Sequence, residues 1–385
     1  MRLAVARVHQ DTSDLDERER FAARVSAAGP PPGSLALLTC HRAELYALVG
    51  DDADARASFE AILGSLPRSA IVESDREAVL HLFRVAAGLD SAITGERQII
   101  GQIRAAYEGA RPSVGGPLAA LFERALHVGR SLRASSALGR TRSSLGSLAV
   151  AAALARFAVP EGARVVVLGA GEMGKLAARA LARRVASLTL VNRDVERATA
   201  IADVADGRAL PLAALPSALA TADALISAAD TRGAILTLDL LAPHAARGLV
   251  VVDVAVPRSV GPDARELLGA SYISVDELVP VEESLRPEER ARCEARCADE
   301  ADALLDKLRG GLAAETIARL RERAEAVRQR QLERALSRLG HLSDRDRGIV
   351  EALSAGLVNA LIHEPTVSLR EAPTRAAAAR ELFRL

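Results

Sequence analysis

The stretch RVVVLGAGEMGKLAARALARR, at residues 164–184, constrains the fold more than any other part of the sequence. A short apolar run is followed directly by G-x-G-x-x-G and then by an amphipathic helical pattern. The glycines permit a tight turn and let the backbone approach a pyrophosphate, which then lies at the positive end of the helix. The strand–turn–helix context therefore predicts a Rossmann-type dinucleotide site formed by Gly169, Ala170, Gly171, Glu172, Met173 and Gly174.

The end of the next apolar run, TLVNRDVERA, indicates which dinucleotide to expect. An enzyme that prefers NAD places Asp or Glu here, against the ribose hydroxyls. This chain has Asn192 and Arg193 instead. An amide and an arginine suit an additional 2′-phosphate, so we expect NADPH; Asp194, one residue later, is the feature that argues against this preference.

The sequence around the glycine motif keeps the same alternation of strands and helices. Further strand patterns follow in ADALISAA and GLVVVDVAVP, with helical patterns between them. This spacing is typical of parallel strands joined by helices. We expect a doubly wound α/β cofactor domain over residues 143–282.

The N-terminal part, residues 1–142, has a different pattern. Short β-capable runs at 2–8, 35–39 and 44–49 are separated by helical patterns, one of them at about 16–28. A longer helical region is expected from about 75 to 110. The pattern predicts a compact α+β domain.

From about residue 283 the sequence becomes helical and highly charged. A long polar helix is expected to end at the glycine pair 310–311, and more helices follow to residue 385. Helices of this kind, with few aromatic residues, are typical of a bundle that forms a homodimer. The chain as a whole is therefore expected to be a multidomain α/β protein.

Composition excludes several other classes of protein. The formal net charge is zero, which excludes a polycationic protein that coats nucleic acid but allows local Arg clusters to bind a folded RNA. No apolar run approaches the ~20 residues that span a bilayer, and the N-terminus lacks the form of a signal peptide. Three cysteines do not form a disulfide framework, so we expect a reduced, cytoplasmic setting.

One of those cysteines, Cys40, stands between two apolar runs in SLALLTCHRAELYALVG. A single cysteine is most often structural, but His41 and Arg42 are expected to supply positive charge that stabilises a thiolate. A thiolate attacks carbonyl carbon. With an NADPH domain in the same chain, a thioester on Cys40 that is reduced by hydride makes a coherent scheme.

Several segments resemble the glutamyl-tRNA reductase family. LLTCHRAELYA resembles its T-C-N-R-x-E-[IL]-Y segment, and HLFRVAAGLDSAITGERQIIGQIRAAY resembles its second signature. GAGEMG, VNRDVERA and DVAVPR resemble its cofactor domain, and the C-terminal helical sequence resembles its dimerisation domain. The similarity spans nearly the whole chain in the right order.

The resemblance implies a reaction and its partners. Glutamyl-tRNA(Glu) would be reduced with NADPH to glutamate-1-semialdehyde, the entry to tetrapyrrole synthesis by the five-carbon route. Cys40 would attack the aminoacyl carbonyl, expel the tRNA and hold a glutamyl thioester. The enzyme would be a homodimer away from membranes, and the aminomutase that consumes the semialdehyde is a further partner that the resemblance implies.

The resemblance also assigns residues. His81 would act with Cys40, polarising the carbonyl or carrying a proton, while Arg42 would pair with a carboxylate and Glu96 with the substrate ammonium. The 7- and 4-residue steps from Ser91 to Gln98 and Gln102 place them on one helix face if the helix is continuous there. The full substrate-binding set would be Thr39, His41, Arg42, Ser91, Glu96, Arg97, Gln98 and Gln102.

The chain departs from the family pattern at the substrate site. His41 replaces the usual Asn, Arg97 replaces the usual Pro, and the residues after His9 differ. Three alternatives therefore stay open: a divergent paralogue with reduced or changed activity, a shikimate-dehydrogenase-like oxidoreductase in which Cys40 is incidental, and a dimeric tRNA-binding regulator without activity. No metal is expected, because Cys293 and Cys297, four residues apart, have no further Cys or His nearby to complete a site.

Overall fold

The computed structural model describes residues 2–50, 54–91, 93–96, 98–140, 144–229, 231, 233–278 and 285–385. The chain forms two compact units, Met1–Ala298 and Asp299–Leu385. Within the described ranges, no helix combines the length and the apolar character needed to cross a membrane.

The first unit begins with a four-stranded antiparallel sheet in the order β2-β3-β1-β4. Three of these strands confirm the runs expected from the sequence; the fourth is four residues long and was not expected. Their bounds are β1 (Arg2–His9), β2 (Ser34–Leu38), β3 (Arg42–Val49) and β4 (Ile71–Ser74).

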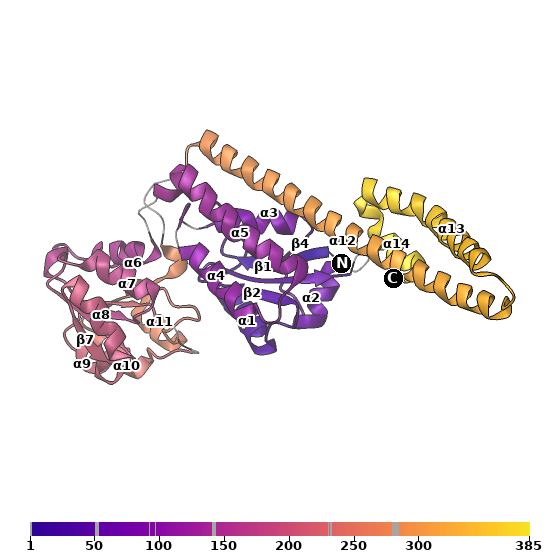
Figure 1. The fold of residues 1–385 in the computed structure, drawn as a ribbon. Coiled ribbons are helices and arrows are strands. Elements are labelled where there is room, and N and C mark those ends of the chain that lie inside the picture. The colour runs from indigo at the N-terminus through magenta and orange to yellow at the C-terminus, as the bar shows by residue number, and fades with distance from the viewer. Residues whose placement is uncertain are drawn as a thin grey trace. The chain divides into compact units, whose positions relative to one another are not determined.

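The two faces of this sheet have different partners (Figure 1). Leu45 and Ala47 pack in an apolar cluster with Phe21 and Phe59, from α1 (Leu15–Ala28) and α2 (Ala55–Leu63). Because side chains alternate along a strand, Arg42, Glu44 and Tyr46 of β3 project to the opposite face, which is covered by α3 (Arg76–Ala87) and α5 (Gly116–Ser135). A row of polar side chains is thereby buried beneath two helices.

The helical region expected at 75–110 is not continuous, which corrects the sequence prediction. α3 ends at Gly88, whose φ of 82° is left-handed and caps the helix, and α4 (Gln98–Ala110) begins ten residues later. Gly95 N donates to Gly88 O at 2.9 Å and closes the loop between them. Glycine readily adopts this conformation, so the loop replaces helix where Ser91 and Glu96 lie.

The cofactor domain is a parallel six-stranded sheet in the order β10-β9-β8-β5-β6-β7, which confirms the doubly wound Rossmann prediction. One face packs against α6, α7 and α8, and the other against α9, α10 and α11. The strands are β5 (Arg164–Leu168), β6 (Ser187–Asn192), β7 (Arg208–Pro211), β8 (Ala224–Ser227), β9 (Val250–Asp253) and β10 (Tyr272–Ser274). The helices are α6 (Leu145–Leu154), α7 (Glu172–Leu181), α8 (Val195–Ala205), α9 (Leu215–Leu219), α10 (Leu238–Ala245) and α11 (Pro262–Leu268).

Short 3₁₀ turns join several of these elements. They are η1 (Ala137–Arg140), η2 (Pro160–Gly162), η3 (Leu212–Ala214), η4 (Gly269–Ser271) and η5 (Val275–Glu277) in the first unit, and η6 (Pro373–Arg375) in the second.

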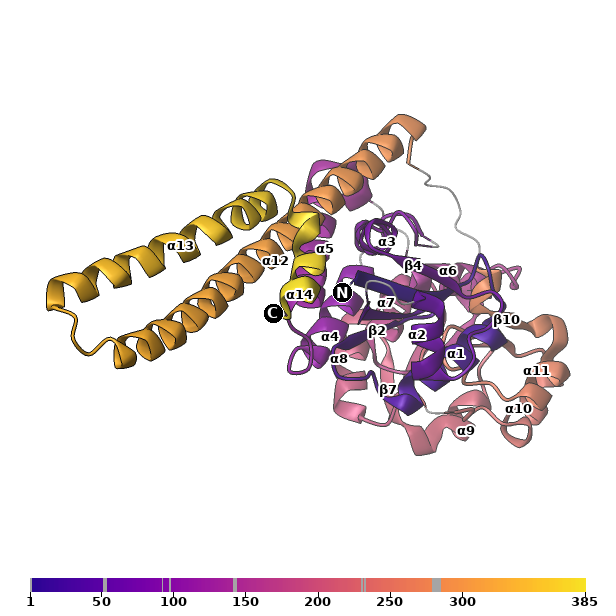
Figure 2. The same cartoon turned by 90° about the vertical axis from the view of Figure 1, so that its right-hand side faces the viewer.

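The second unit is helical. α12 (Pro287–Arg338) starts in the first unit, and its later part runs beside α13 (Asp344–Glu371), with α14 (Ala376–Phe383) following (Figure 2). The expected helix end at 310–311 is wrong, because α12 continues through both glycines. Each glycine in a helix costs only about 1 kcal/mol relative to alanine, and the neighbouring residues are good helix formers.

Candidate active site

Cys40 lies at the turn between β2 and β3. Thr39 N donates to Arg42 O at 2.9 Å, and His41 N donates to the Thr39 hydroxyl at 3.3 Å. These bonds close the hairpin and hold the cysteine at its tip. The Cys40 thiol, half-buried, donates to Val254 O at 3.7 Å, so the hairpin reaches the carboxyl end of β9 in the cofactor domain.

A small cavity surrounds the Cys40 sulfur and gathers most of the expected substrate residues. Its volume is about 10 Å³, room for about one water molecule, so a glutamyl group does not fit until the surrounding groups move apart. Met173, from the glycine loop, also lines it. The lining is Thr39, Cys40, His41, Arg42, Ser91, Glu96, Ile99, Gln102, Leu145 and Met173.

The charge around Cys40 differs from the sequence expectation. Burial, helped by the neighbouring Glu96, raises the pKa of the thiol to about 12. Burial and Arg42 lower the pKa of His41 to about 3, so His41 is neutral at physiological pH and supplies no positive charge. The expected stabilisation of a thiolate by His41 is therefore wrong.

Arg42 is held by other groups. Its guanidinium pairs with Glu44 at 3.2 Å and donates to Asp90 O at 2.5 Å. His9 Nε2 lies 3.4 Å from Arg42 Nη2. His81 and Arg42 lower the pKa of the buried Glu44 carboxyl, and its carboxylate pairs with Arg42 and offsets part of that charge. The expectation that Arg42 stabilises a Cys40 thiolate is therefore also corrected, because Arg42 is held in its ion pair with Glu44.

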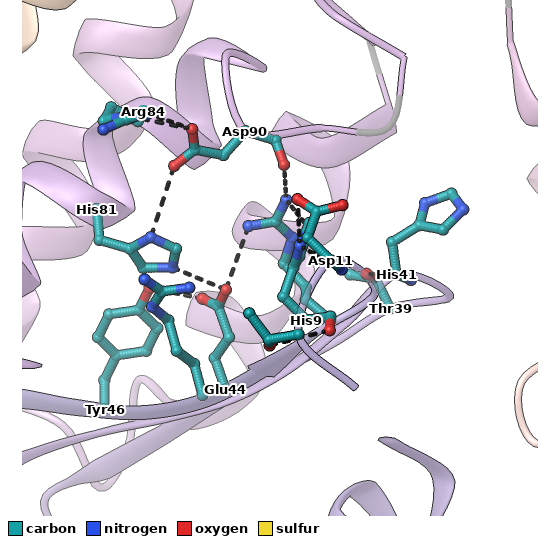
Figure 3. Close-up of polar contacts among 12 residues, drawn as sticks. His9, Asp11, Thr39, His41, Glu44, Tyr46, His81, Arg84 and Asp90 are labelled. Carbon is teal, nitrogen blue, oxygen red and sulfur yellow. Dashed lines mark hydrogen bonds and ion pairs between the residues drawn. The ribbon is translucent and has the colours of Figure 1, made fainter. Parts of the chain in front are cut away.

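Arg42 belongs to a buried polar network with Glu44 and Asp90. Figure 3 shows the other members of this network, among them His81 and Tyr46. His81 Nε2 lies 2.9 Å from Glu44 Oε1, and Tyr46 donates to Glu44 Oε2 at 2.6 Å. Asp90 lies 3.6 Å from His81 Nδ1. Burial opposes protonation of His81, but Glu44 and Asp90 outweigh it and raise the pKa of the imidazole.

His81 lines a second and larger cavity, of about 650 Å³, rather than the cavity at the sulfur. Arg42 and Ser91 line both cavities, so the two adjoin. The structure therefore places His81 beside the cysteine site but across Arg42 from it. Glu44 and Asp90 were not singled out from the sequence, although Glu44 occupies the acidic position of the T-C-N-R-x-E segment.

The glycine loop has the geometry that a bound dinucleotide requires. A Cβ on Gly174 would lie 1.9 Å from Gly169 O, and Gly169 itself has a φ of 106°. A Cβ on Gly171 would meet nothing within 4 Å, so internal packing does not require a glycine there. The space beside Gly171, at the start of α7, fits the approach of a pyrophosphate.

Two adjoining cavities of about 610 and 590 Å³ lie at this edge of the sheet and share Gly169, Asn192 and Arg193. Ala170 and Arg197 line the second, and Arg197 is an addition that sequence analysis missed. Asp194 accepts from Arg197 N at 3.1 Å as the N-cap of α8. Asp194 lines this cavity as well, so the carboxylate that argues against a 2′-phosphate lies there beside two arginines, Arg193 and Arg197. The lining residues fit a phosphorylated dinucleotide.

The remaining residues that the sequence predicted for the site lie in different places. Glu172 opens α7 but lines neither dinucleotide cavity. Gln98 begins α4, separated from Ser91 by the loop, so the predicted single helix face is wrong for Ser91. Arg97 lies outside the described residues. In the described part of the chain, no group of three potential ligands could hold a metal ion.

The fold and site define a class: an oxidoreductase whose Rossmann domain faces a domain carrying a cysteine. Comparison with known proteins makes this specific. The family model described as "Glutamyl-tRNAGlu reductase, N-terminal domain" matches residues 7–136, "Shikimate / quinate 5-dehydrogenase" matches 151–281, and "Glutamyl-tRNAGlu reductase, dimerisation domain" matches 292–385.

Relatives match over almost the whole chain. The glutamyl-tRNA reductase of Halobacterium salinarum is 35% identical over 95% of this chain and 88% of its own length. That of Rubrobacter xylanophilus is 35% identical over 96% of this chain and 92% of its own. The solved glutamyl-tRNA reductase of Methanopyrus kandleri is 27% identical, with a TM-score of 0.53, and covers 99% of this chain and 98% of its own.

The chain belongs to the glutamyl-tRNA reductase family. It is an NADPH-dependent oxidoreductase that acts on glutamyl-tRNA, at the first committed step of tetrapyrrole synthesis by the five-carbon route. The likeness to shikimate dehydrogenases is confined to the cofactor domain.

Proposed function

We propose that the chain reduces glutamyl-tRNA to glutamate-1-semialdehyde through a thioester on Cys40. The Cys40 sulfur attacks the ester carbonyl carbon, the bond from that carbon to the tRNA oxygen breaks, and the thiol proton ends on the released tRNA hydroxyl. The main observation that supports this proposal is that Cys40 and Met173 line the same cavity. The thiol of one domain and the glycine loop of the other meet there.

Sulfur suits both halves of such a reaction. A thiolate is a good nucleophile toward an ester, and it is also a good leaving group when a hemithioacetal collapses to an aldehyde. When bound, NADPH supplies the hydride that reduces the thioester carbonyl. The residues that would hold it are Gly169, Ala170, Gly171, Gly174, Asn192, Arg193 and Arg197.

The residues around Cys40 are proposed to hold the glutamyl group. Glu96 faces the cavity and is placed for the substrate ammonium. Burial raises the pKa of its carboxyl to about 7, so the ionised form that would pair with the ammonium gains as pH rises through neutrality. Arg42, fixed by Glu44 at the junction of the two cavities, is placed for a substrate carboxylate. His81, which lines the larger cavity, is proposed to supply a proton, because Glu44 and Asp90 raise its pKa and so favour the protonated imidazole.

We propose roles for the remaining parts by the same reasoning. Residues 1–142 would form the catalytic domain, 143–282 the cofactor domain and 283–385 the linker helix and dimerisation domain. The last would form a homodimer, supported by the match to a dimerisation-domain model. Because the substrate is an aminoacyl-tRNA, the reaction belongs in the cytoplasm, and handover of the reactive aldehyde to the aminomutase that consumes it would limit its loss.

An assay of the purified chain with glutamyl-tRNA and NADPH tests this function. We expect semialdehyde from wild type and none from Cys40→Ser, with NADPH binding retained in the variant; Cys293→Ser, on α12, is the matched control. Normal turnover by Cys40→Ser would favour the shikimate-dehydrogenase-like alternative. Binding of tRNA without aldehyde from wild type would favour the regulator.

A further inference from the structure

The nucleophile proposed above needs positive charge, and His41 and Arg42 do not supply it. The charged groups that act on the Cys40 sulfur are Glu96, before α4, and Asp253, in β9, both of which raise its pKa, and Arg18, in α1, which lowers it. Arg18 also lowers the pKa of His41, the next residue of the hairpin tip. The same arginine therefore acts on both residues of the tip.

Arg18 is buried, with 2% of its surface exposed. Its Nη1 donates to Ser13 O at 2.8 Å, and its Nη2 forms a short ion pair with Asp276. Its Nε has no hydrogen-bond partner among the described atoms. A buried donor without a partner is unfavourable, so this guanidinium has capacity for an acceptor that arrives during the reaction.

Arg18 and Cys40 meet the same edge of the cofactor sheet. Cys40 donates to Val254 O, directly after β9, and Asp276 follows β10, the neighbouring parallel strand. Leu15, one turn before Arg18 on α1, packs in the apolar core of the cofactor domain, and Cys40 packs against that core too. Ligands of a doubly wound sheet bind at the carboxyl ends of the strands.

We propose that Arg18 is a positioning residue whose charge favours the thiolate of Cys40 over the thiol, and that Asp276 of the cofactor domain competes for that charge. The proposal rests on the thioester function of Cys40. In the described structure Asp276 neutralises part of the Arg18 charge. Withdrawal of Asp276 leaves that charge for the sulfur, so the placement of the cofactor domain controls the reactivity of the nucleophile.

Alkylation of Cys40 tests this without any turnover. The rate with iodoacetamide is measured on the full chain between about pH 7 and 10, and Cys40 is resolved from Cys293 and Cys297 by peptide mass spectrometry. For Arg18→Gln we expect a rate about tenfold lower at each pH, the change that corresponds to one unit of thiol pKa. For Asp276→Asn we expect a higher rate, because the competing carboxylate is gone.

The alkylation rate is expected to change in opposite directions in Arg18→Gln and Asp276→Asn. This distinguishes an effect of charge on the Cys40 sulfur from easier access of the reagent. Both substitutions break the same ion pair, so a role in domain packing alone would speed alkylation in both variants. Arg18→Lys keeps the charge and should restore the rate, whereas Arg20→Gln, an exposed neighbour on α1, should leave it unchanged. A second probe, the rate ratio of anionic iodoacetate to neutral iodoacetamide, should fall in Arg18→Gln because it reports the local potential.

An alkylation rate in Arg18→Gln that equals or exceeds wild type would overturn the proposal. That result is distinguishable from failure of the proposed function, which would appear as semialdehyde formation by Cys40→Ser. If Arg18→Gln does not fold, the rate ratio of iodoacetate to iodoacetamide in Asp276→Asn, at a residue 33% exposed, decides: loss of the carboxylate should raise the ratio, whereas looser domain packing alone should leave it unchanged. An unchanged or lower rate in Asp276→Asn would also contradict the proposal.

Discussion

His81 Nε2, from α3, and Glu44 Oε1, from β3, lie 2.9 Å apart and are 6% and 0% exposed. Glu44 has three partners: His81, Arg42 and Tyr46. Breaking a buried charge pair on one side is strongly destabilising because it leaves the other charge unpaired. This arrangement fixes Arg42, and through it the cysteine hairpin.

Replacement of Glu44 by Gln is therefore expected to lower the free energy of unfolding by about 3 kcal/mol. It should also lower the pKa of His81, since Glu44 is the main group that raises it. Denaturant unfolding measures the first effect and NMR titration of the imidazole the second. Glu77→Gln, an exposed change on α3, is the control.

The same pair predicts how stability varies with pH. The pKa of His81 is raised above its ordinary 6.5, so its contribution is complete below that value and is lost as pH rises through the folded pKa. The pKa of Glu44 is lowered from 4.5, so its contribution is present above that value and is lost as pH falls. The difference in stability between wild type and Glu44→Gln should be largest between these two values; a difference independent of pH would contradict the assignment.

Coenzyme preference is expected to depend on Arg193 and Arg197, which line the same cavity beside the glycine loop. A hydrogen bond to a charged group contributes about 1.5–3 kcal/mol, so Arg193→Ala should weaken NADPH binding by roughly 10- to 100-fold and NADH binding little. Arg197→Ala should act in the same direction. Fluorescence titration with both coenzymes measures this, with Arg184→Ala on the same domain as control; equal losses for NADPH and NADH would show that neither arginine contacts the 2′-phosphate.

The homodimer is expected to use an apolar stripe on α13. Ile349, Leu353, Leu357 and Leu361 recur at four-residue steps and are 58–76% exposed, a pattern that a partner surface would bury. Leu357→Glu should yield monomers by analytical ultracentrifugation. Val204→Glu, at an exposed apolar residue of α8, should leave the assembly unchanged, and a dimeric Leu357→Glu would place the interface elsewhere.

Sequence patterns correctly predicted those structural elements that are determined by neighbouring residues in the chain. The glycine turn, the parallel strands around it and the cysteine between two strands follow from neighbouring residues, and the structure has them. The helix break at Gly88 depends on a bond from Gly95, which periodicity does not reveal. The glycine pair at 310–311 failed as a helix end because favourable neighbours outweigh its cost.

The charged groups of the site were harder to predict, because their partners are distant in sequence. Arg18 pairs with Asp276, 258 residues later, and Glu44 meets His81, 37 residues later. The positive charge expected from His41 and Arg42 was wrong for two other reasons: burial keeps His41 neutral, and Glu44, two residues further on the same face of β3, pairs with Arg42. Only the folded chain shows which charges reach the sulfur.

The thioester itself can be measured most directly. The full chain is incubated with glutamyl-tRNA in the absence of NADPH, digested at low pH and examined by peptide mass spectrometry. The account predicts the mass of one added glutamyl group on the Cys40 peptide, its absence in Cys40→Ser, and its loss as semialdehyde appears when NADPH is added. Semialdehyde formation at a normal rate with no glutamyl group on Cys40 at any time would contradict it.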